Sequence, residues 1–302
     1  MNDVRTTADL RAEGLGSEEL ARKVRAAELV HLRRGAYADP GSLQDAEARH
    51  RALVLATVPL LAPGAVVSHV SAAILHGLPL LDAPRARVQI TRADARGGKN
   101  RGGVHLHAAP LEETEVVPVE GVATTTLART VLDLARSLSR EAAVVSGDAA
   151  LRRGLDRDEL DALLAGAGRR PRIARARAVA GLLDGRSESP GESLSRLLLA
   201  GAGLAPELQH EVRDAGGAFV ARCDFAWPEH RTVGEFDGKI KYGRLLAPGT
   251  TSEEIVYREK LREDKLRDLG WQVVRWVWRD LERPERVVER LVRAFARAGF
   301  PL

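Results

Sequence analysis

The sequence predicts a mixed α/β protein, α+β overall, in which helical and strand-rich stretches follow one another in three segments. Many stretches place apolar residues with the period of an amphipathic helix, and others alternate apolar and polar residues as strands do. Glycine, serine and proline gather at 185–191, which indicates a linker. We therefore predict three domains, at residues 1–40, 45–185 and 188–302.

Composition narrows the class of protein. A hydrophobic fraction of 44% and a charged fraction of 29% are typical of a globular protein. No run approaches the ~18 apolar residues of a membrane-spanning helix, and the first residues, MNDVRTTADLRAEG, are too polar for a secretory signal. The single cysteine, Cys223, excludes a disulfide framework. We expect a cytoplasmic protein with no membrane partner, whose net charge of +4 permits an anionic partner.

The first segment, residues 1–40, predicts two short helices and a strand. Ala8–Glu13 and Ser17–Glu28 have helical periodicity and are separated by a glycine-bearing turn, whereas Leu29–Ala38 alternates as a strand does. This order is typical of a winged-helix-like unit that binds DNA, and the alternative is a small helical packing module without DNA contact. The DNA-contacting residues that we expect here are Arg22, Lys23, Arg25, Arg33 and Arg34.

The second segment, residues 45–185, is predicted to be helical with a β-rich stretch inside it. The predicted helices are Asp45–Leu61, Ser68–His76, Thr125–Leu138, Arg140–Leu151, Arg157–Leu164 and Ile173–Leu183. The predicted strands are Arg87–Thr91, Gly103–His107 and Val116–Thr124, with a glycine-rich loop at 93–103.

Histidines in this segment could suggest a metal site. His69 and His76 are seven residues apart on one predicted helix, about 10 Å at ~1.5 Å per residue, too far to share an ion. His105 and His107 share one face of a predicted strand. We interpret all four as structural histidines.

The third segment predicts the order α-β-β-β-α-β-α. The predicted helices are Glu192–Gly201, Ser252–Leu269 and a last helix that begins at Pro284 and ends before Gly299. The predicted strands are Glu207–Arg213, Phe219–Trp227, Thr232–Gly238 and Trp271–Trp278.

Acidic residues occupy the hairpin formed by the second and third of these strands. If the turn after Pro228 is centred between Glu229 and His230, Asp224 faces Glu235 across the strand pair. Directly opposed residues have Cβ atoms about 4.5–5.5 Å apart, so two carboxylates there repel each other. A divalent cation between them would remove that penalty.

Three further groups complete a candidate catalytic site. Glu235, Asp237 and Lys239 have the spacing of one strand face, and Glu192 lies in the preceding helix. Carboxylate oxygens favour Mg²⁺ or Mn²⁺, which can polarise a phosphate and acidify a bound water. A lysine can stabilise the charge that develops on phosphate oxygens, and Glu192 can supply a further carboxylate or hold the water.

The stretch from Glu192 to Leu281 resembles the PD-(D/E)XK nuclease superfamily, in particular its Vsr-like (very-short-patch-repair-like) endonuclease branch. The similarity rests on Asp224-Phe225, on the E-x-D-G strand at 235–238, and on a downstream block. The residues of that block are Arg258, Leu266, Gly270, Val273 and Arg275. The resemblance implies an αβββαβ restriction-endonuclease-like core, Mg²⁺-dependent phosphodiester cleavage, and metal ligands at Asp224 and Glu235, with Asp237 as a third candidate.

The sequence also departs from that pattern. Cys223 stands where the pattern has proline before Asp224. If Glu235 is the acidic ligand, the residue two positions on is Asp237 rather than lysine, whereas Asp237-Gly-Lys239 supplies D-x-K one step later. Many relatives have a histidine shortly after E-x-D-G. Here Lys239 or Lys241 would have to take its place, and Lys241 is also a candidate DNA contact.

A second resemblance covers the front of the chain. The segments LVHLRRGAYA (29–38) and VVSHVSAAILHGLPL (66–80) are similar to AbiEi-type antitoxins of type IV toxin–antitoxin systems. This resemblance implies a winged-helix N-terminus used on promoter DNA, followed by a mixed α/β domain. The partners expected are therefore DNA and, besides it, a cognate toxin or a second copy of the chain.

Two groups of arginines remain. Arg169, Arg170 and Arg172 have almost no acidic neighbours in sequence, which favours contact with a nucleic-acid backbone. The arginines of the last helix could line a phosphate track, but acidic residues four positions before two of them favour a solvated face instead.

Three functions remain open from the sequence. The leading hypothesis is a divalent-metal-dependent DNA endonuclease whose front domains choose the DNA. The alternative is an antitoxin-like transcriptional regulator with a catalytically inactive nuclease-like domain. A purely structural scaffold is the third. The pattern at 235–239 is the feature that divides the first two.

Overall fold

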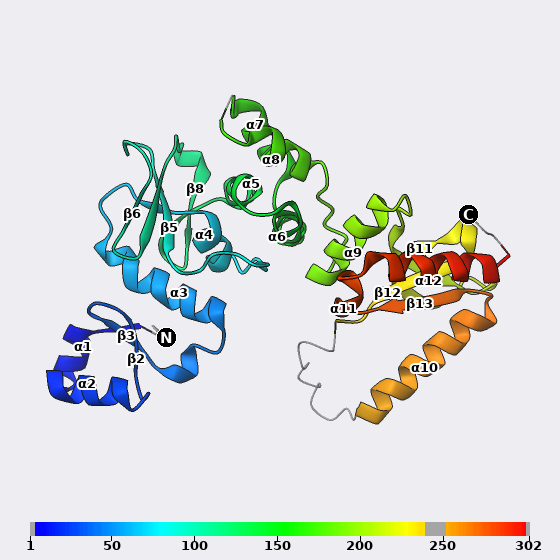
Figure 1. The fold of residues 1–302 in the computed structure, drawn as a ribbon, viewed down its shortest axis with the longest axis horizontal. Coiled ribbons are helices and arrows are strands. Elements are labelled where there is room, and N and C mark those ends of the chain that lie inside the picture. The colour runs from blue at the N-terminus through cyan, green and yellow to red at the C-terminus, as the bar shows by residue number, and fades with distance from the viewer. Residues whose placement is uncertain (1–3, 169, 239–251, 300–302) are drawn as a thin grey trace. The chain divides into compact units, whose positions relative to one another are not determined.

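The computed structural model of the chain describes residues 4–168, 170–238 and 252–299. It is a mixed α/β protein, as predicted, and it divides into two compact units, Met1–Leu183 and Asp184–Leu302 (Figure 1). In the described part of the chain, no helix combines the length and apolar character needed to cross a membrane.

The first unit begins with a small three-stranded sheet and two helices. In chain order these are β1 (Val4–Thr6), α1 (Thr7–Ala12), α2 (Ser17–Arg25), β2 (Val30–Arg33) and β3 (Ala36–Ala38). The strands lie in the order β1-β3-β2, and the buried side chains of Leu10, Leu20 and Leu29 form the core between sheet and helices. Thr6 begins α1 because its hydroxyl accepts the N–H of Asp9 at 3.2 Å.

The predicted strand Leu29–Ala38 is instead a hairpin of β2 and β3. The chain reverses at Gly35, whose φ of +82° is accessible to glycine at little cost. The alternating pattern runs through this turn, so periodicity alone did not reveal it. The short strand β1, which pairs with β3, was not predicted either.

The rest of the first unit combines helices with a six-stranded mixed sheet. Its helices are η1 (Pro40–Ser42), α3 (Ala46–Thr57), η2 (Val58–Leu60), α4 (His69–Leu75), η3 (Glu113–Glu115), α5 (Leu127–Ser137), α6 (Arg140–Arg152), α7 (Arg157–Gly166) and α8 (Ile173–Ala180). Its strands are β4 (Val66–Val67), β5 (Val88–Arg92), β6 (Lys99–Arg101), β7 (Val104–Ala108), β8 (Val116–Val119) and β9 (Val122–Thr125).

The sheet has the order β6-β7-β5-β4-β9-β8. The predicted strand Val116–Thr124 is divided into β8 and β9, because Glu120 and Gly121 both adopt positive φ, as a two-residue hairpin turn requires. One face of the sheet packs Val88 and Ile90 against α3 and α4. All seven residues of α4 are buried, so this helix is an internal element of the unit.

The second unit has the predicted order of main elements, with two short helices in addition, one of which begins at Trp278, where the last strand was predicted to end. It contains α9 (Pro190–Gly201), β10 (Glu207–Arg213), β11 (Phe219–Trp227), η4 (Pro228–His230), β12 (Thr232–Phe236), α10 (Ser252–Asp268), β13 (Gln272–Trp276), α11 (Trp278–Leu281) and α12 (Pro284–Arg297). The third strand ends at Phe236, two residues before the predicted end.

The four strands of this unit lie in the order β10-β11-β12-β13, antiparallel except for the parallel pair β12–β13. Helices cover both faces (Figure 1). On one face, Leu199 of α9 and Leu291 of α12 pack with Phe225 and Trp276. On the other, Leu266 of α10 packs against β11 and β12.

Two glycines allow the close packing around β12. A Cβ at Gly234 would lie 2.5 Å from the Trp276 ring, and a Cβ at Gly191 would lie 1.9 Å from the Phe236 ring. Any larger residue at Gly191 would push the beginning of α9 away from β12. The contact at Gly191 therefore helps to fix the position of Glu192, the next residue of α9.

Candidate functional site

The hairpin β11–β12 has the register that its turn predicts. Phe225 pairs with Gly234, and the same register puts Asp224 opposite Glu235 at the next position. There, Oδ2 of Asp224 accepts the backbone N–H of Phe236 at 2.8 Å. The Asp224 carboxylate therefore lies against the backbone of β12 at the end of the strand pair.

The neighbouring strand pair is irregular at this position. Gln209 of β10 faces Asp224 in the register, but it makes no ladder pair and has a φ of +55°. A non-glycine residue with positive φ is uncommon, and such residues concentrate at functional sites. Its side-chain amide donates to Oε2 of Glu192 at 3.0 Å. The irregular residue thus connects β10 with α9.

At this irregular position, the side chains of β10 and β11 change from one face of the sheet to the other. Phe225 belongs to the core beside α9 and α12, whereas Cys223, two residues earlier, belongs to the core beside α10. In a regular strand two such residues would lie on one face. The prediction that Asp224 and Glu235 converge on one face assumed regular alternation, and the structure differs from it for this reason.

Glu192 is held at the beginning of α9. Its side chain is only 8% exposed and accepts three hydrogen bonds. The donors are the N–H of Glu188 at 2.8 Å, the hydroxyl of Ser189 at 2.8 Å and the amide of Gln209. The hydroxyl of Ser189 in turn accepts the backbone N–H of Glu192 at 3.2 Å and so caps the N-terminus of α9. Glu192 therefore has a structural role besides any functional one.

The carboxyl group of Asp224 is easily protonated. Burial and, after it, the negative charge of Glu192 raise the pKa of Asp224 to about 7, although the hydrogen bond from the N–H of Phe236 opposes both. Glu235 and Glu188 also raise this pKa, with smaller effects. Asp224 consequently titrates near neutral pH, and a positive charge nearby would favour its ionised form.

Glu235 is bound by two arginines. Its Oε1 accepts from Nη2 of Arg262 on α10 at 2.5 Å, and its Oε2 accepts from Nε of Arg275 on β13 at 2.9 Å. The same arginines contact Glu259 and Glu263 of α10. The carboxylate of Glu235 is 12% exposed and neutralised on both oxygens.

The remaining predicted residues of this site are described only in part. Asp237 is half-buried, and its N–H donates to the carbonyl of Trp276 at 2.9 Å, which continues the parallel ladder. Lys239, Lys241 and the side chain of Arg258 lie outside the described residues. Cys223 is fully buried, and burial raises the pKa of its thiol to about 12.

A divalent cation does not fit Glu235 as it lies. Mg²⁺ needs about six oxygen ligands at ~2.0–2.1 Å in near-octahedral geometry. Over residues 4–168, 170–238 and 252–299, no group of three Asp, Glu, His or Cys side chains is placed to hold a metal ion. A dication on Glu235 would also stand close to two guanidinium groups, which would repel it.

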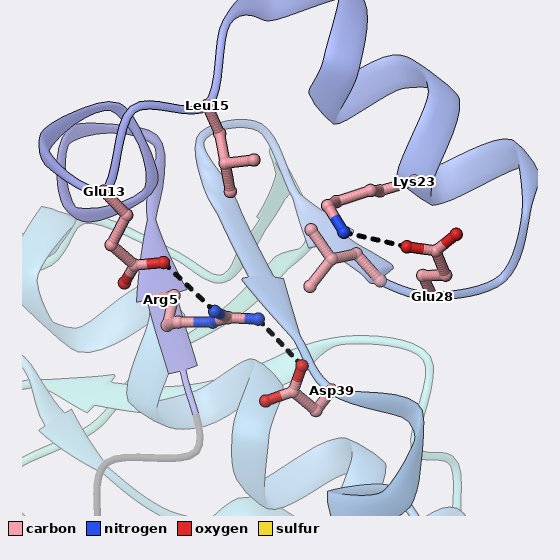
Figure 2. A pocket seen from close by; sticks show the side chains of 7 residues that line it. Arg5, Glu13, Leu15, Lys23, Glu28 and Asp39 are labelled. Carbon is pink, nitrogen blue, oxygen red and sulfur yellow. Dashed lines mark hydrogen bonds and ion pairs between the residues drawn. The ribbon is translucent and has the colours of Figure 1, made fainter.

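The DNA-binding candidates of the first segment fall into two groups. Arg22 and Arg25 lie on the exposed side of α2, and Arg34 is exposed at the turn between β2 and β3. Arg22 pairs with Glu19 at 3.4 Å on that exposed side, whereas Lys23 is only partly exposed and forms an ion pair with Glu28 at 2.8 Å. Its ammonium is directed into a hollow behind α2 rather than along the exposed side of the helix (Figure 2).

That hollow has a volume of about 340 Å³. The ion pair of Lys23 and Glu28 lies at one wall, and the ion pairs of Arg5 lie at another. Arg5 of β1 bonds Glu13 at 3.3 Å and Asp39 at 2.7 Å (Figure 2). Arg33, predicted to contact DNA, is half-buried, and its Nε has no hydrogen-bond partner in the described part of the chain.

The predicted basic group after α7 is partly described. Arg172 precedes α8 with a φ of +61° and donates to the carbonyl of Arg136 at 3.4 Å. Burial lowers the pKa of Arg136, and the charge of Arg170 lowers it further despite the opposing effect of Asp133. Arginines therefore gather at the beginning of α8. Arg169 lies outside the described residues.

Three histidines of the first unit are packed together without a metal-like arrangement. The His107 ring stacks on His69 at 3.6 Å and on His105 at 4.1 Å, with interplanar angles of 12° and 21°. Stacked rings cannot direct their nitrogen lone pairs at one ion. His76 lies elsewhere and bonds the carbonyl of Thr125 at 2.7 Å.

Sequence reasoning missed the side chains that surround the acids. Gln209 gave no signal, because glutamine has no preference for the left-handed region. Arg275 was noted only as part of the downstream block. Glu259, Arg262 and Glu263 have the three- and four-residue spacing of neighbours on one helix face, and that spacing was the available signal.

No family model matches the chain. Over 183 residues it is 37% identical to two proteins of Mycobacterium tuberculosis, Uncharacterized protein MT2308 and Uncharacterized protein Rv2248. The match covers 60% of this chain and 64% of each relative, so it spans less than two thirds of their length.

A similar solved structure is the crystal structure of the RV2827C protein from Mycobacterium tuberculosis. The superposition has a TM-score of 0.38 and 17% sequence identity, and it covers 70% of this chain and 83% of that one. At these values the likeness decides neither fold nor function.

Proposed function

We propose that the chain is a DNA-binding protein, similar in role to AbiEi-type antitoxins, whose nuclease-like C-terminal unit is catalytically inactive. The observation that carries the DNA-binding part is the winged-helix-like order β1-α1-α2-β2-β3. In it, α2 presents Arg22 and Arg25 to solvent, and the hairpin turn presents Arg34. A helix and a wing of this kind contact the major groove and the backbone of duplex DNA.

The inactive part of the proposal rests on Glu235. A metal ion that hydrolyses a phosphodiester is held by two or more carboxylates, and their oxygens must be free to bind it. Here both oxygens of Glu235 are bound to guanidinium groups. The αβββαβ unit would then serve as a folded platform, and the expected partners are DNA in the cytoplasm and a cognate toxin or a second copy of the chain.

The test is to measure, by fluorescence anisotropy, the binding of the chain to a short random-sequence DNA duplex in EDTA at several salt concentrations. Wild-type chain should bind without metal. The double variant Arg22→Gln/Arg25→Gln should bind more weakly and lower the slope of log K against log salt by about 2, one for each lost phosphate contact. Because Arg293 is exposed on α12 and pairs with Glu289, Arg293→Gln is the matched control and should change nothing.

Unchanged affinity in the double variant would remove α2 from the DNA contact and, with it, this proposal. Binding that requires Mg²⁺ would instead point to the C-terminal unit as the DNA contact.

A second candidate function, a divalent-metal-dependent DNA endonuclease, is favoured by one observation. Burial and the negative charge of the buried Glu192 raise the pKa of the half-buried Asp224 to about 7, and a cation would relieve the repulsion between these two acids. The test is nicking of supercoiled plasmid in Mg²⁺ or Mn²⁺. Cleavage that is lost in Asp224→Asn supports an enzyme, and intact plasmid in both metals leaves the regulator.

A further inference from the structure

Three histidine rings form a column in the first unit. The ring of His107 stacks on His69 at 3.6 Å and on His105 at 4.1 Å. A flat ring holds one stacked neighbour on each face, so His107 is the middle of the column and the other two rings are its ends. His69 is 7% exposed, whereas His105 is only half-buried. The column therefore runs from the interior of the unit to its surface, where it ends at His105.

The outer face of His105 is left open by its own strand. His107 occupies the face of the ring toward the end of β7, and the residue two positions before His105 is Gly103, which has no side chain. Among the described residues, a Cβ at Gly102 or Gly103 would meet no atom within 4 Å beyond its chain neighbours. One more flat ring can therefore continue the stack at this end of the column.

Amide side chains flank the ring of His105. Asn100 of β6 and Gln89 of β5 both pair with His105, one in each neighbouring ladder. Directly opposed side chains share one face of a sheet. Gln89 is buried and its Oε1 contacts Nε2 of His107 at 3.3 Å, but Asn100 is exposed. Because an amide both donates and accepts, Asn100 can bond the edge of a base that lies on His105.

Three exposed cations border the same place, and we call them the basic edge: Arg96, Lys99 and Arg101. Within the described part of the chain, none of them forms an ion pair with an acid. The acid nearest to them in the sequence, Asp94, already pairs with Arg92 at 2.6 Å. β6 is the outermost strand of its sheet, and its two cations lie one residue to either side of Asn100. The surface beside the open end of the column is therefore suited to an anionic chain.

We propose that the β6–β7 hairpin binds single-stranded nucleic acid, with an unpaired base stacked on the outer face of His105 and the sugar–phosphate backbone along the basic edge. Proteins hold single strands by stacking bases on aromatic rings and by placing cations along the backbone. In a duplex the faces of the bases are covered by their neighbours, so this surface selects unpaired nucleotides. The proposal involves neither α2 nor the C-terminal unit, and it holds or fails independently of the duplex contact.

The experiment measures, by fluorescence anisotropy in EDTA, the binding of the full chain to a short labelled oligothymidylate and to an abasic strand of the same length. Wild type should prefer the strand with bases by at least about fivefold, the effect of one base stacked on an aromatic ring. An oligouridylate of the same length is the third probe. Tighter binding of either strand with bases, DNA or RNA, supports the proposal and identifies the better single strand.

Two substitutions of similar bulk isolate the ring. His105→Phe keeps a flat ring and should retain the preference for bases, whereas His105→Leu should bind the strands with and without bases alike. Each protein is compared on two strands, so a loss of folded protein changes both affinities equally and leaves their ratio unchanged. The difference between the two variants should persist when Arg22→Gln and Arg25→Gln are added, because α2 is not part of this surface.

The basic edge is tested by salt dependence. The triple variant Arg96→Gln/Lys99→Gln/Arg101→Gln should bind both strands more weakly and lower the slope of log K against log salt by about 2, at ~0.7 for each lost phosphate contact. The matched control is Arg140→Gln, since Arg140 is exposed on α6 of the same unit and pairs with Glu141 at 2.9 Å. It should leave both affinities unchanged.

Three outcomes overturn the proposal. Equal affinity of wild type for strands with and without bases would leave the basic edge as charges that keep β6 from pairing with another chain. Equal preferences for bases in His105→Phe and His105→Leu would show that the ring does not hold the base. Loss of single-strand binding on removal of Arg22 and Arg25 would place the strand on α2 instead.

Discussion

Each of the two units encloses one polar centre, and the two centres are opposite in chemistry. The first unit buries bases, the stacked rings of His69 and His107, beside the ion pair of Arg129 and Asp133. The second has acids, the buried Glu192 and the half-buried Asp224, whose pKa the charge of Glu192 helps to raise. In both centres burial keeps a titratable group uncharged. Burial therefore makes the stabilities of the two units respond to acid in opposite directions.

The sign for the first unit follows from its histidines. Burial lowers the pKa of His69, and burial together with the neighbouring charges of His69, His105 and Arg136 lowers the pKa of His107 to about 3. The unfolded chain therefore takes up protons near pH 6.5 that the folded unit does not. The stability that the neutral histidines contribute is complete above pH 6.5 and is lost as pH falls toward 3.

The sign for the second unit follows from Asp224. Because its pKa is raised to about 7 from the ordinary value of 3.8, the folded unit holds a proton that the unfolded chain releases. That contribution to stability is complete below pH 3.8 and is lost as pH rises through 7.

The largest expected effect is the loss of the buried ion pairs in the first centre. Arg129 is 0% exposed and donates to Glu115 at 2.8 Å and to Asp133 at 3.1 Å. Arg129→Met leaves two buried carboxylates without their cation, which should cost about 3–5 kcal/mol. Amide hydrogen exchange of α5 measures the free energy of opening.

A control for this prediction is the exposed ion pair of Arg92 and Asp94. Arg92→Met should cost less than about 1 kcal/mol, since solvent already screens that pair. If the two substitutions cost the same, the first centre does not depend on its buried charges.

The second prediction concerns the acidic centre. Asp224→Asn removes the ionised form that is unfavourable above pH 7, so the variant should be more stable than wild type at pH 8 by about 2–4 kcal/mol. The gain should disappear near pH 4. Urea unfolding followed by tryptophan fluorescence measures it, and Glu229→Gln on the exposed turn should show no such gain. Destabilisation at pH 8 would contradict the assignment of a raised pKa.

The third prediction concerns acid and the histidine stack. Wild type should lose about 1–2 kcal/mol of stability in the first unit between pH 6.5 and pH 4, after allowance for the partial exposure of His107. His107→Gln should flatten this dependence, whereas His31→Gln in the small sheet should leave it unchanged. The measurement is hydrogen exchange of α4 at several pH values, converted to a free energy of opening with the intrinsic exchange rate at each pH. A free energy of opening in wild type that does not change with pH would break the comparison.

The smallest expected effect concerns two residues with positive φ, and it separates the cost of backbone strain from the value of a hydrogen bond. Arg231, which ends η4, has a φ of +45°, and Arg231→Gly should stabilise the second unit by about 1 kcal/mol through relief of that strain. Gln209→Gly relieves similar strain but loses the hydrogen bond to Glu192, so its net effect should lie near zero. Equal gains in both variants would show that the Glu192 contact contributes nothing.

The sequence was most informative where local pattern determines structure. The periodicities and the linker predict the element order of the second unit, and Pro228 predicts the register of its hairpin. The same reasoning failed where the pattern is broken by one residue. Gln209 exchanges the faces of two strands, and Gly35 divides one predicted strand into two. Neither backbone angle is visible in the alternation of apolar and polar residues.

Contacts between segments that are distant in the sequence were the other feature that the sequence did not predict. Arg275 reaches Glu235 across 40 residues, and His69 of α4 meets His107 of β7. The arginines are chemically able to pair with many acids in this chain, so only the tertiary arrangement decides which ones they neutralise. That choice changes the interpretation of the candidate site more than any motif does.

The burial of Cys223 has a practical consequence. With no exposed surface and a pKa raised to about 12, its thiol will not compete for maleimide or disulfide reagents at neutral pH. A single cysteine introduced at the exposed residue Glu18 of α2 can then be labelled selectively in the otherwise native chain. A fluorophore at that position would report directly, in solution, whether duplex DNA approaches this helix.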